Sequence, residues 1–213
     1  MVVTPTNVRI AALISGGGRT VCNLQTAILE GRVDASIACV IASREGLSGI
    51  DRASEAGLNV YVPRQDDYEE DLQRLIRECQ PDLICLCGYL RKLDLHPSWH
   101  GRVINIHPSL LPRHGGKGMY GMHVHTAAIE SGDEFSGCTV HFVDDQYDQG
   151  PILLQRACPI RSGDTPETLA ARVFAEECIA LPQAIDMISR NKVKLVDGRV
   201  EINAACEVGR GSL

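Results

Sequence analysis

Short apolar runs alternate with amphipathic segments through the first half of this 213-residue chain. The apolar runs and the helix-like segments follow one another at 8–14, 20–30, 35–42, 50–56, 58–62, 68–79, 83–87 and 103–106. A continuous apolar run is typical of a strand buried on both faces, and strands that alternate with helices are typical of a parallel sheet. The sequence therefore predicts an α/β fold with a doubly wound, mostly parallel sheet.

A different pattern follows residue 107. A glycine-rich loop is expected at 110–122, and then a helix at about 123–131 and strands at 138–143 and 152–158. The pattern predicts a long helix at 165–189, which opens with Thr165-Pro166-Glu167, and a hairpin at 192–202 around Asp197-Gly198. No repeat or linker is visible, so we expect one domain over 1–213, with flexible ends at 1–7 and 203–213.

Charge and hydropathy argue against two classes of partner. The net charge of −6 disfavours general nucleic-acid binding, which needs a basic surface. No stretch reaches the roughly 20 apolar residues of a membrane helix, and no signal-peptide pattern follows Met1. We therefore expect neither a nucleic-acid nor a membrane partner.

The nine cysteines do not form a recognisable motif. No pair has C-x-x-C spacing, and most of the cysteines lie within apolar runs. An odd number of cysteines also disfavours a disulfide framework. We expect buried, reduced thiols that act as small apolar side chains, and a cytoplasmic location.

A glycine turn follows the first expected strand. Backbone N–H groups in such a turn, together with the start of the next helix, can bind an anion. The pattern matches neither the dinucleotide motif nor the Walker motif, and a plain tight turn remains the alternative. The candidate phosphate-binding residues are Gly16, Gly17, Gly18, Arg19 and Thr20.

Asn105 and His107 stand at the end of the strand expected at 103–106. Alternation along a strand places both side chains on one side. An amide and an imidazole placed side by side can stabilise a developing oxyanion. A lone histidine would more often be structural, but the pair before Pro108 favours a functional site.

An acidic turn carries His141, Asp144, Asp145 and Asp148 between the strands at 138–143 and 152–158. A carboxylate from this turn could hold His107 and raise its pKa, although an acidic surface turn is the alternative. The residues alone do not decide between the three aspartates. The turn lacks EF-hand spacing, and His123 and His125 lack the spacing of paired ligands on one helix face, so we expect no metal.

Taken together, these segments resemble the phosphoribosylglycinamide formyltransferases, the folate-dependent glycinamide ribonucleotide transformylases. The resemblance covers roughly residues 8–196, and it is most specific in the Asn-Ile-His-Pro-Ser-Leu-Leu-Pro segment at 105–112 and in the segment 137–151. It implies formyl transfer from 10-formyltetrahydrofolate to the amine of glycinamide ribonucleotide in purine synthesis. It also implies small-molecule partners and a monomer or homodimer.

The resemblance assigns roles to individual residues. It makes Asn105, His107 and Asp148 catalytic, with a protonated His107 and Asn105 stabilising the oxyanion and Asp148 relaying the amine proton. Glu177, next to Glu176, would contact the substrate, whose phosphate would lie on the glycine turn. The folate-binding residues would be Leu90, Arg91, Lys92, Leu93 and Asp144.

Two segments depart from the family pattern. Arg19-Thr20-Val21-Cys22 precedes Asn23, which implies a longer phosphate turn than usual. The segment 113–121 is also longer than usual and could be a lid or could change which amine is accepted. Transfer to another amine, hydrolysis, and a non-catalytic folate- or nucleotide-binding module are the alternative functions. The Asn105–His107 pair argues against a mere binding module.

Overall fold

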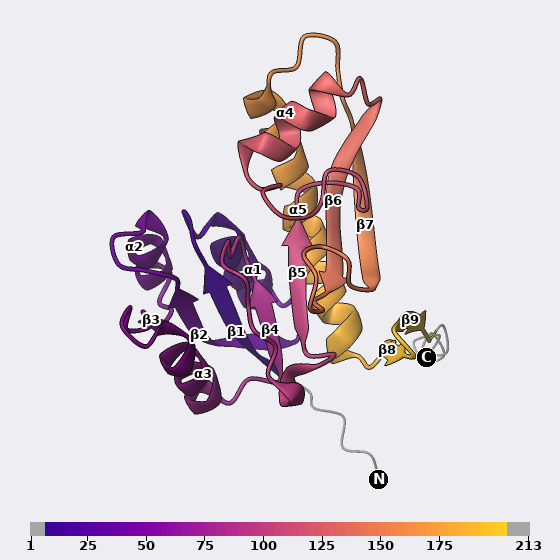
Figure 1. The fold of residues 1–213 in the computed structure, drawn as a ribbon. Coiled ribbons are helices and arrows are strands. Elements are labelled where there is room, and N and C mark those ends of the chain that lie inside the picture. Colours follow the sequence, from indigo (N-terminus) through magenta and orange to yellow (C-terminus); the bar gives the residue numbers. More distant parts are fainter. Residues whose placement is uncertain (1–6, 204–213) are drawn as a thin grey trace.

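The computed structural model describes residues 7–203, so most of the predicted flexible ends lie outside the described residues. A seven-stranded sheet in the order β3-β2-β1-β4-β5-β6-β7 forms the centre of the molecule (Figure 1). Its strands are β1 (Val8–Ile14), β2 (Ala35–Ala42), β3 (Val60–Tyr61), β4 (Leu83–Leu86), β5 (Val103–His107), β6 (Phe135–Phe142) and β7 (Ile152–Pro159).

The sheet is parallel from β3 to β5 and antiparallel at β6 and β7. Helices cover both of its faces, which confirms the doubly wound, mostly parallel fold. Three helices, α1 (Arg19–Leu29), α2 (Ser48–Glu55) and α5 (Pro166–Ser189), pack on the face to which Ile10 and Ala12 of β1 point. The helix α3 (Tyr68–Cys79) and the short η1 (Pro97–Trp99) pack on the other face.

The second half of the chain also follows the predicted order. Along the chain, the helix α4 (Met122–Glu130) connects β5 to β6, and the hairpin of β8 (Val193–Val196) and β9 (Arg199–Ile202) follows α5 (Figure 1). Positive φ angles of 48° at Asp197 and 71° at Gly198 give this hairpin the tight turn that its sequence indicated. No helix in the described part of the chain is long and apolar enough to cross a membrane.

Several boundaries differ from the prediction. The third strand is shorter, β6 starts at Phe135 rather than at residue 138, and η1 was not foreseen. The helix α1 begins at Arg19, directly after Gly18. Val21 and Cys22 therefore lie within the helix, and the expectation of a longer phosphate turn is wrong. These residues continue a helical backbone, so they add nothing to the loop.

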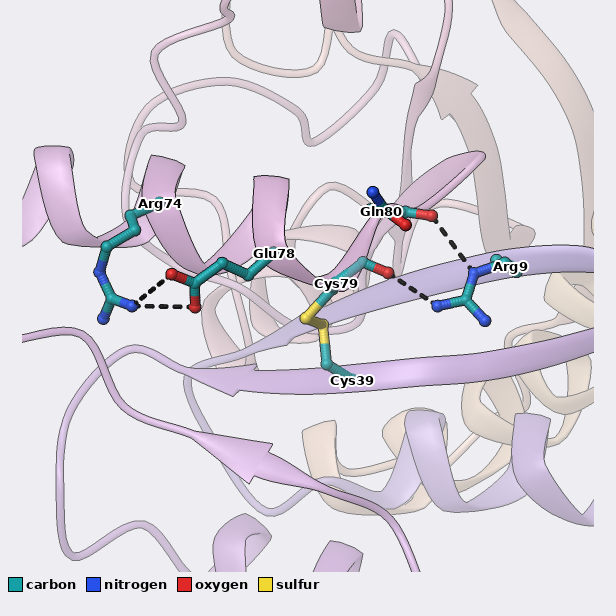
Figure 2. The surroundings of a disulfide bond; sticks show 6 residues. All are labelled: Arg9, Cys39, Arg74, Glu78, Cys79 and Gln80. Atoms are coloured by element: carbon teal, nitrogen blue, oxygen red, sulfur yellow. Dashed lines mark hydrogen bonds and ion pairs between the residues drawn. A yellow bond between two sulfur atoms is a disulfide. The ribbon is translucent and has the colours of Figure 1, made fainter.

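Cys39 of β2 and Cys79 at the end of α3 form a disulfide (Figure 2). This bond corrects the expectation that all the thiols are reduced. A register shift between Ile37 and Cys39 interrupts the alternation of β2, so Cys39 faces the layer that α3 covers. The two cysteines are 40 residues apart, and no local pattern connects them. The described cysteines at 22, 85, 87, 138, 158 and 178 are free thiols, whereas Cys206 lies outside the described residues.

Because two of the cysteines form a disulfide, reduced thiols no longer support the predicted cytoplasmic location. The location itself stays a prediction.

Candidate active site

The carboxyl ends of β1, β4 and β5 lie along one edge of the sheet, where open α/β sheets bind their ligands. A cavity of about 610 Å³ opens there. Residues from distant parts of the chain line it, including Arg19, Asn105, His107, Asp148 and Glu177. The edge thus gathers the start of α1, the end of β5, the turn after β6 and the middle of α5.

Asn105 and His107 both contact Asp148, whereas Ile106 between them belongs to the core layer under α1 and α5. This confirms the prediction that strand alternation puts the two side chains on one side of β5. The strand β6 pairs with β5 and places His141 opposite Asn105. His107 is 4% exposed, and Asn105 is partly buried. Both side chains therefore stand in an environment with little water, where hydrogen bonds are strong.

His141 orients the Asn105 amide. Nδ1 of His141 is 2.8 Å from the carbonyl oxygen of Phe142, which can only accept a hydrogen bond, so Nδ1 carries a proton. In a neutral ring Nε2 then accepts, and Asn105 Nδ2 lies 3.1 Å from it. Asn105 Nδ2 also donates to Asp148 Oδ1 at 3.3 Å. The amide donors of Asn105 are thereby fixed at the edge of the cavity.

His107 has an acceptor at each ring nitrogen. Its Nε2 lies 2.9 Å from the carbonyl oxygen of His114, and its Nδ1 lies 3.5 Å from Asp148 Oδ2. Burial nevertheless lowers the pKa of His107 below its ordinary value, and the Asp148 charge and the His114 carbonyl offset only part of this effect. Asp148 thus raises the pKa of His107, as expected, but desolvation outweighs the ion pair, so the net shift is downward and the expected protonated His107 is not favoured in the free protein.

Asp148 is the aspartate of the acidic turn that reaches Asn105 and His107. It adopts a left-handed backbone with φ of 57°, and its Oδ2 accepts the backbone N–H of Gly116 at 2.9 Å. Burial would raise its pKa, but the neighbouring His141 and His107 rings and the Gly116 N–H lower the pKa below the ordinary value overall. Asp148 is thus an ionised carboxylate beside a neutral imidazole.

The predicted phosphate-binding residues divide into two groups. Arg19 and Thr20 line the cavity, whereas Gly16, Gly17 and Gly18 are not among its lining residues. Gly18 caps α1 in the left-handed conformation and offers no side-chain cap, so the first N–H groups of the helix lack a side-chain acceptor there. Arg19 stacks on the Phe174 ring of α5, 3.8 Å from its centroid.

Glu177 lines the cavity, and its predicted contact with the substrate stays a prediction. Burial raises the pKa of its carboxyl to about 7, although Arg19 partly opposes this shift. The adjacent Glu176 instead forms an ion pair with Arg156 of β7, at 2.7 Å. The structure thus distinguishes the two glutamates, because Glu177 lines the cavity and Glu176 pairs with Arg156. The resemblance favoured Glu177 without excluding Glu176.

The predicted folate-binding residues border two cavities. Leu90 lines the large one. Arg91, Lys92, Leu93 and Asp144 line a smaller cavity of about 70 Å³. Asn105 and Asp148 line both cavities. Asn105 and Asp148 therefore lie where the two cavities meet, and His107 lies beside them in the large one.

Sequence reasoning missed other parts of the cavity wall. His125 of α4 is 4% exposed, lines the cavity, and has an Nδ1 atom without a hydrogen-bond partner among the described residues. Phe174 and Tyr147 also line the cavity. The predicted lid segment contributes residues 116–121 to the wall, but whether it moves stays a prediction. No local pattern distinguishes these side chains, because their positions depend on packing between distant elements.

No group of three or more potential metal ligands is found within residues 7–203.

Comparisons with known proteins point to one family. The family described as "Formyl transferase" matches residues 8–185. The chloroplastic phosphoribosylglycinamide formyltransferase of Vigna unguiculata is 36% identical over 199 residues, covering 90% of this chain and 64% of that protein. The trifunctional purine biosynthetic protein adenosine-3 of Drosophila melanogaster is 39% identical over 193 residues, covering 84% of this chain and 14% of that protein.

A solved structure has the same fold. Glycinamide ribonucleotide transformylase 1 from Symbiobacterium toebii superposes with a TM-score of 0.83 and 35% identity, over 93% of this chain and 95% of that one. The match to the family extends from β1 into α5 and includes Asn105, His107 and Asp148. The chain therefore belongs to the formyl transferase family.

Proposed function

We propose that this protein transfers the formyl group of 10-formyltetrahydrofolate to the amine of glycinamide ribonucleotide, a step of purine synthesis. The observation that carries the proposal is that Asn105 and Asp148 line both cavities, with His107 beside them in the large one. A two-substrate transfer needs such a junction, because the donor and the acceptor must meet at the reacting groups.

The large cavity suits a phosphorylated acceptor. Arg19 supplies a cation at the start of α1, where backbone N–H groups also favour an anion. Glu177 in the same cavity can accept hydrogen bonds from substrate hydroxyl groups once it is ionised. The phosphate would then lie at Arg19 and Thr20, and the amine would reach toward Asp148.

The smaller cavity suits the pterin end of the folate. It is bordered by residues 91–93 and by Asp144. Main-chain groups of the 90–93 segment can recognise the pterin edge, and the formyl carbon would then stand beside Asn105. The folate acts here as a co-substrate.

The chemical step is acyl transfer. The acceptor amine attacks the formyl carbon, the C=O π electrons move to oxygen, and a tetrahedral oxyanion forms. As the oxyanion forms, the Asn105 N–H that points to Asp148 in the free protein turns to the oxyanion, and the positive charge that His107 acquires stabilises it. One such donor typically lowers the barrier by about 3 kcal/mol. The C–N bond to the folate then breaks, and the folate nitrogen leaves with a proton.

The Asp148–His107 pair handles the proton of the attacking amine. An ionised carboxylate beside a neutral imidazole can take up one proton as the new C–N bond forms. His107 becomes charged at the moment when the oxyanion needs a counter-charge. The proton then returns to the leaving nitrogen, so the scheme needs neither a covalent protein intermediate nor a metal.

The direct test is to incubate the purified protein with 10-formyltetrahydrofolate, with and without glycinamide ribonucleotide, and to measure release of tetrahydrofolate. We expect release only in the presence of the ribonucleotide, with the formylated ribonucleotide as the second product. Release without the ribonucleotide would indicate a hydrolase, and no release would indicate a binding module; either result would overturn the proposal. The oligomeric state, monomer or homodimer, stays a prediction.

A further inference from the structure

The loop segment 113–116 touches both members of the Asp148–His107 pair through its backbone. The carbonyl oxygen of His114 accepts from His107 Nε2 at 2.9 Å. The N–H of Gly116, two residues later, donates to Asp148 Oδ2 at 2.9 Å. One short piece of main chain therefore orients the imidazole and the carboxylate together.

A carboxylate outside the active-site cavity holds this segment in place. Asp133 lies between α4 and β6, and its Oδ2 accepts from His114 Nε2 at 2.8 Å. Its Oδ1 accepts from Arg113 Nη2. The side chains of Asp133 and His114 are 7% and 13% exposed, whereas that of Arg113 is 63% exposed. The enclosed pair with His114 is therefore the stronger anchor, because water screens it less.

The backbone of the segment cannot adjust freely. His114 has a positive φ of 52°, a conformation that costs free energy for a residue with a side chain. At the next position a Cβ atom on Gly115 would collide with Leu111 and lie 3.3 Å from Asp148 Cβ. Ser109 Oγ donates to the Arg113 carbonyl oxygen at 2.6 Å and fixes the backbone before His114, and the contact with Asp133 fixes the His114 side chain. Together these contacts set the direction of the His114 carbonyl.

We propose that Asp133 is a positioning residue of the active site, which acts through His114 to set the orientation of His107 and Asp148. Asp133 is not among the residues that line the active-site cavity, and it borders a separate hollow with His114 and Arg113. Its effect on catalysis rests on the proposed function, but its effect on His107 does not.

The test is Asp133→Asn. Asparagine keeps the size of the side chain but removes its charge, and its amide nitrogen cannot accept, so the charge-assisted anchor of His114 is lost and at most an uncharged contact remains. We expect kcat to fall about tenfold to a hundredfold, as misplaced catalytic groups cause, while KM for both substrates changes less than about twofold. The His114 carbonyl raises the pKa of His107, so its loss should move the NMR titration of the His107 imidazole to lower pH.

Two further variants control the experiment. Glu134→Gln removes the neighbouring exposed carboxylate and should leave kcat and the His107 titration unchanged. His114→Asn keeps a residue that tolerates positive φ but removes the imidazole. It should therefore reproduce both the fall in kcat and the shift of the His107 titration to lower pH. Asp133→Asn should then add less than about a twofold further loss in the His114→Asn background, because both changes break one contact.

An unshifted His107 titration in Asp133→Asn would overturn the proposal, even if the melting temperature fell. If that variant does not fold, the titration in His114→Asn decides in the same way. The titration is measured on the free protein without substrates. A failure of the proposed formyl transfer is therefore distinguishable from a failure of this inference.

Discussion

The glycine turn at 15–20, through Arg19 and Thr20, and the cluster of Asn105, His107 and Asp148 border one cavity, but they are built differently. The turn is a single contiguous segment that presents the start of α1, and its chemistry is that of backbone N–H groups and one stacked arginine. The cluster joins β5, the turn after β6 and the 113–116 segment through side chains. The comparison teaches that the proposed anion site is built locally, whereas the proposed catalytic cluster depends on long-range assembly.

Backbone strain marks the same difference. Both His114 and Asp148 hold positive φ angles although neither is glycine. The only residue of the turn at 15–20 with a positive φ is Gly18, which adopts it at little cost. Strain in non-glycine residues persists where surrounding contacts enforce it, as they do at the cluster. Changes in the cluster should therefore affect kcat, and changes in the turn should affect KM.

The largest effect is expected for Asp148→Asn. Asparagine tolerates the left-handed backbone of this position, so the fold should persist while the proton acceptor is lost. We expect kcat to fall by about 10²–10⁴-fold, with folate affinity nearly unchanged. Steady-state kinetics and folate binding by fluorescence measure the two quantities.

Asp145→Asn is the matched control, because Asp145 is an exposed carboxylate in the same turn. Its turnover should equal that of the unmodified protein. Near-normal turnover in Asp148→Asn would show that Asp148 is not the proton acceptor. The contrast between a cluster that sets kcat and a turn that sets KM would then no longer hold.

An intermediate effect is expected for Arg19→Ala. Losing a charge-assisted contact to the substrate phosphate should raise KM for the ribonucleotide about tenfold to a hundredfold, with kcat changed far less. Phe174→Leu should give a smaller rise, since it removes only the ring under the guanidinium. Arg77→Ala, which deletes a charge from the exposed side of α3, serves as the control.

An acceptor without its phosphate sharpens this prediction. The nucleoside form of the substrate should bind unmodified protein and Arg19→Ala equally weakly. If Arg19→Ala weakens both acceptors to the same degree, Arg19 does not bind the phosphate.

The smallest effect concerns pH. Glu177, with a pKa of about 7, is protonated below that pH and ionised above it. The ionised form accepts hydrogen bonds more strongly, so kcat/KM for the ribonucleotide should rise as pH increases through about 7. The rise should be about threefold to tenfold, and Glu177→Gln should remove it.

Glu176→Gln provides the comparison for this profile, because Glu176 pairs with Arg156 and is not among the cavity-lining residues. In Glu176→Gln, kcat/KM for the ribonucleotide should still rise as pH increases through about 7. A pH profile in Glu177→Gln identical to that of the unmodified protein would exclude Glu177 from substrate binding.

Local patterns were sufficient for much of the fold. Apolar runs and their glycine boundaries predicted β1, β2, β4 and β5 nearly to the residue, because burial on both faces leaves a continuous signal. The short β3 and η1 were poorly predicted, since few residues carry their pattern. The Cys39–Cys79 disulfide had no signal, because a register shift in β2 and the end of α3 together create it.

The sequence by itself determined that Asn105 and His107 share one side of β5, because alternation along a strand is a local property. It also determined that a helix follows the glycine turn, where we propose that an anion binds. Tertiary structure alone decided that Asp148, and not Asp145, meets them, and that His107 is a buried histidine with a lowered pKa. The physical reason is that desolvation and charge pairing depend on which distant segments exclude water together, and no local spacing records that.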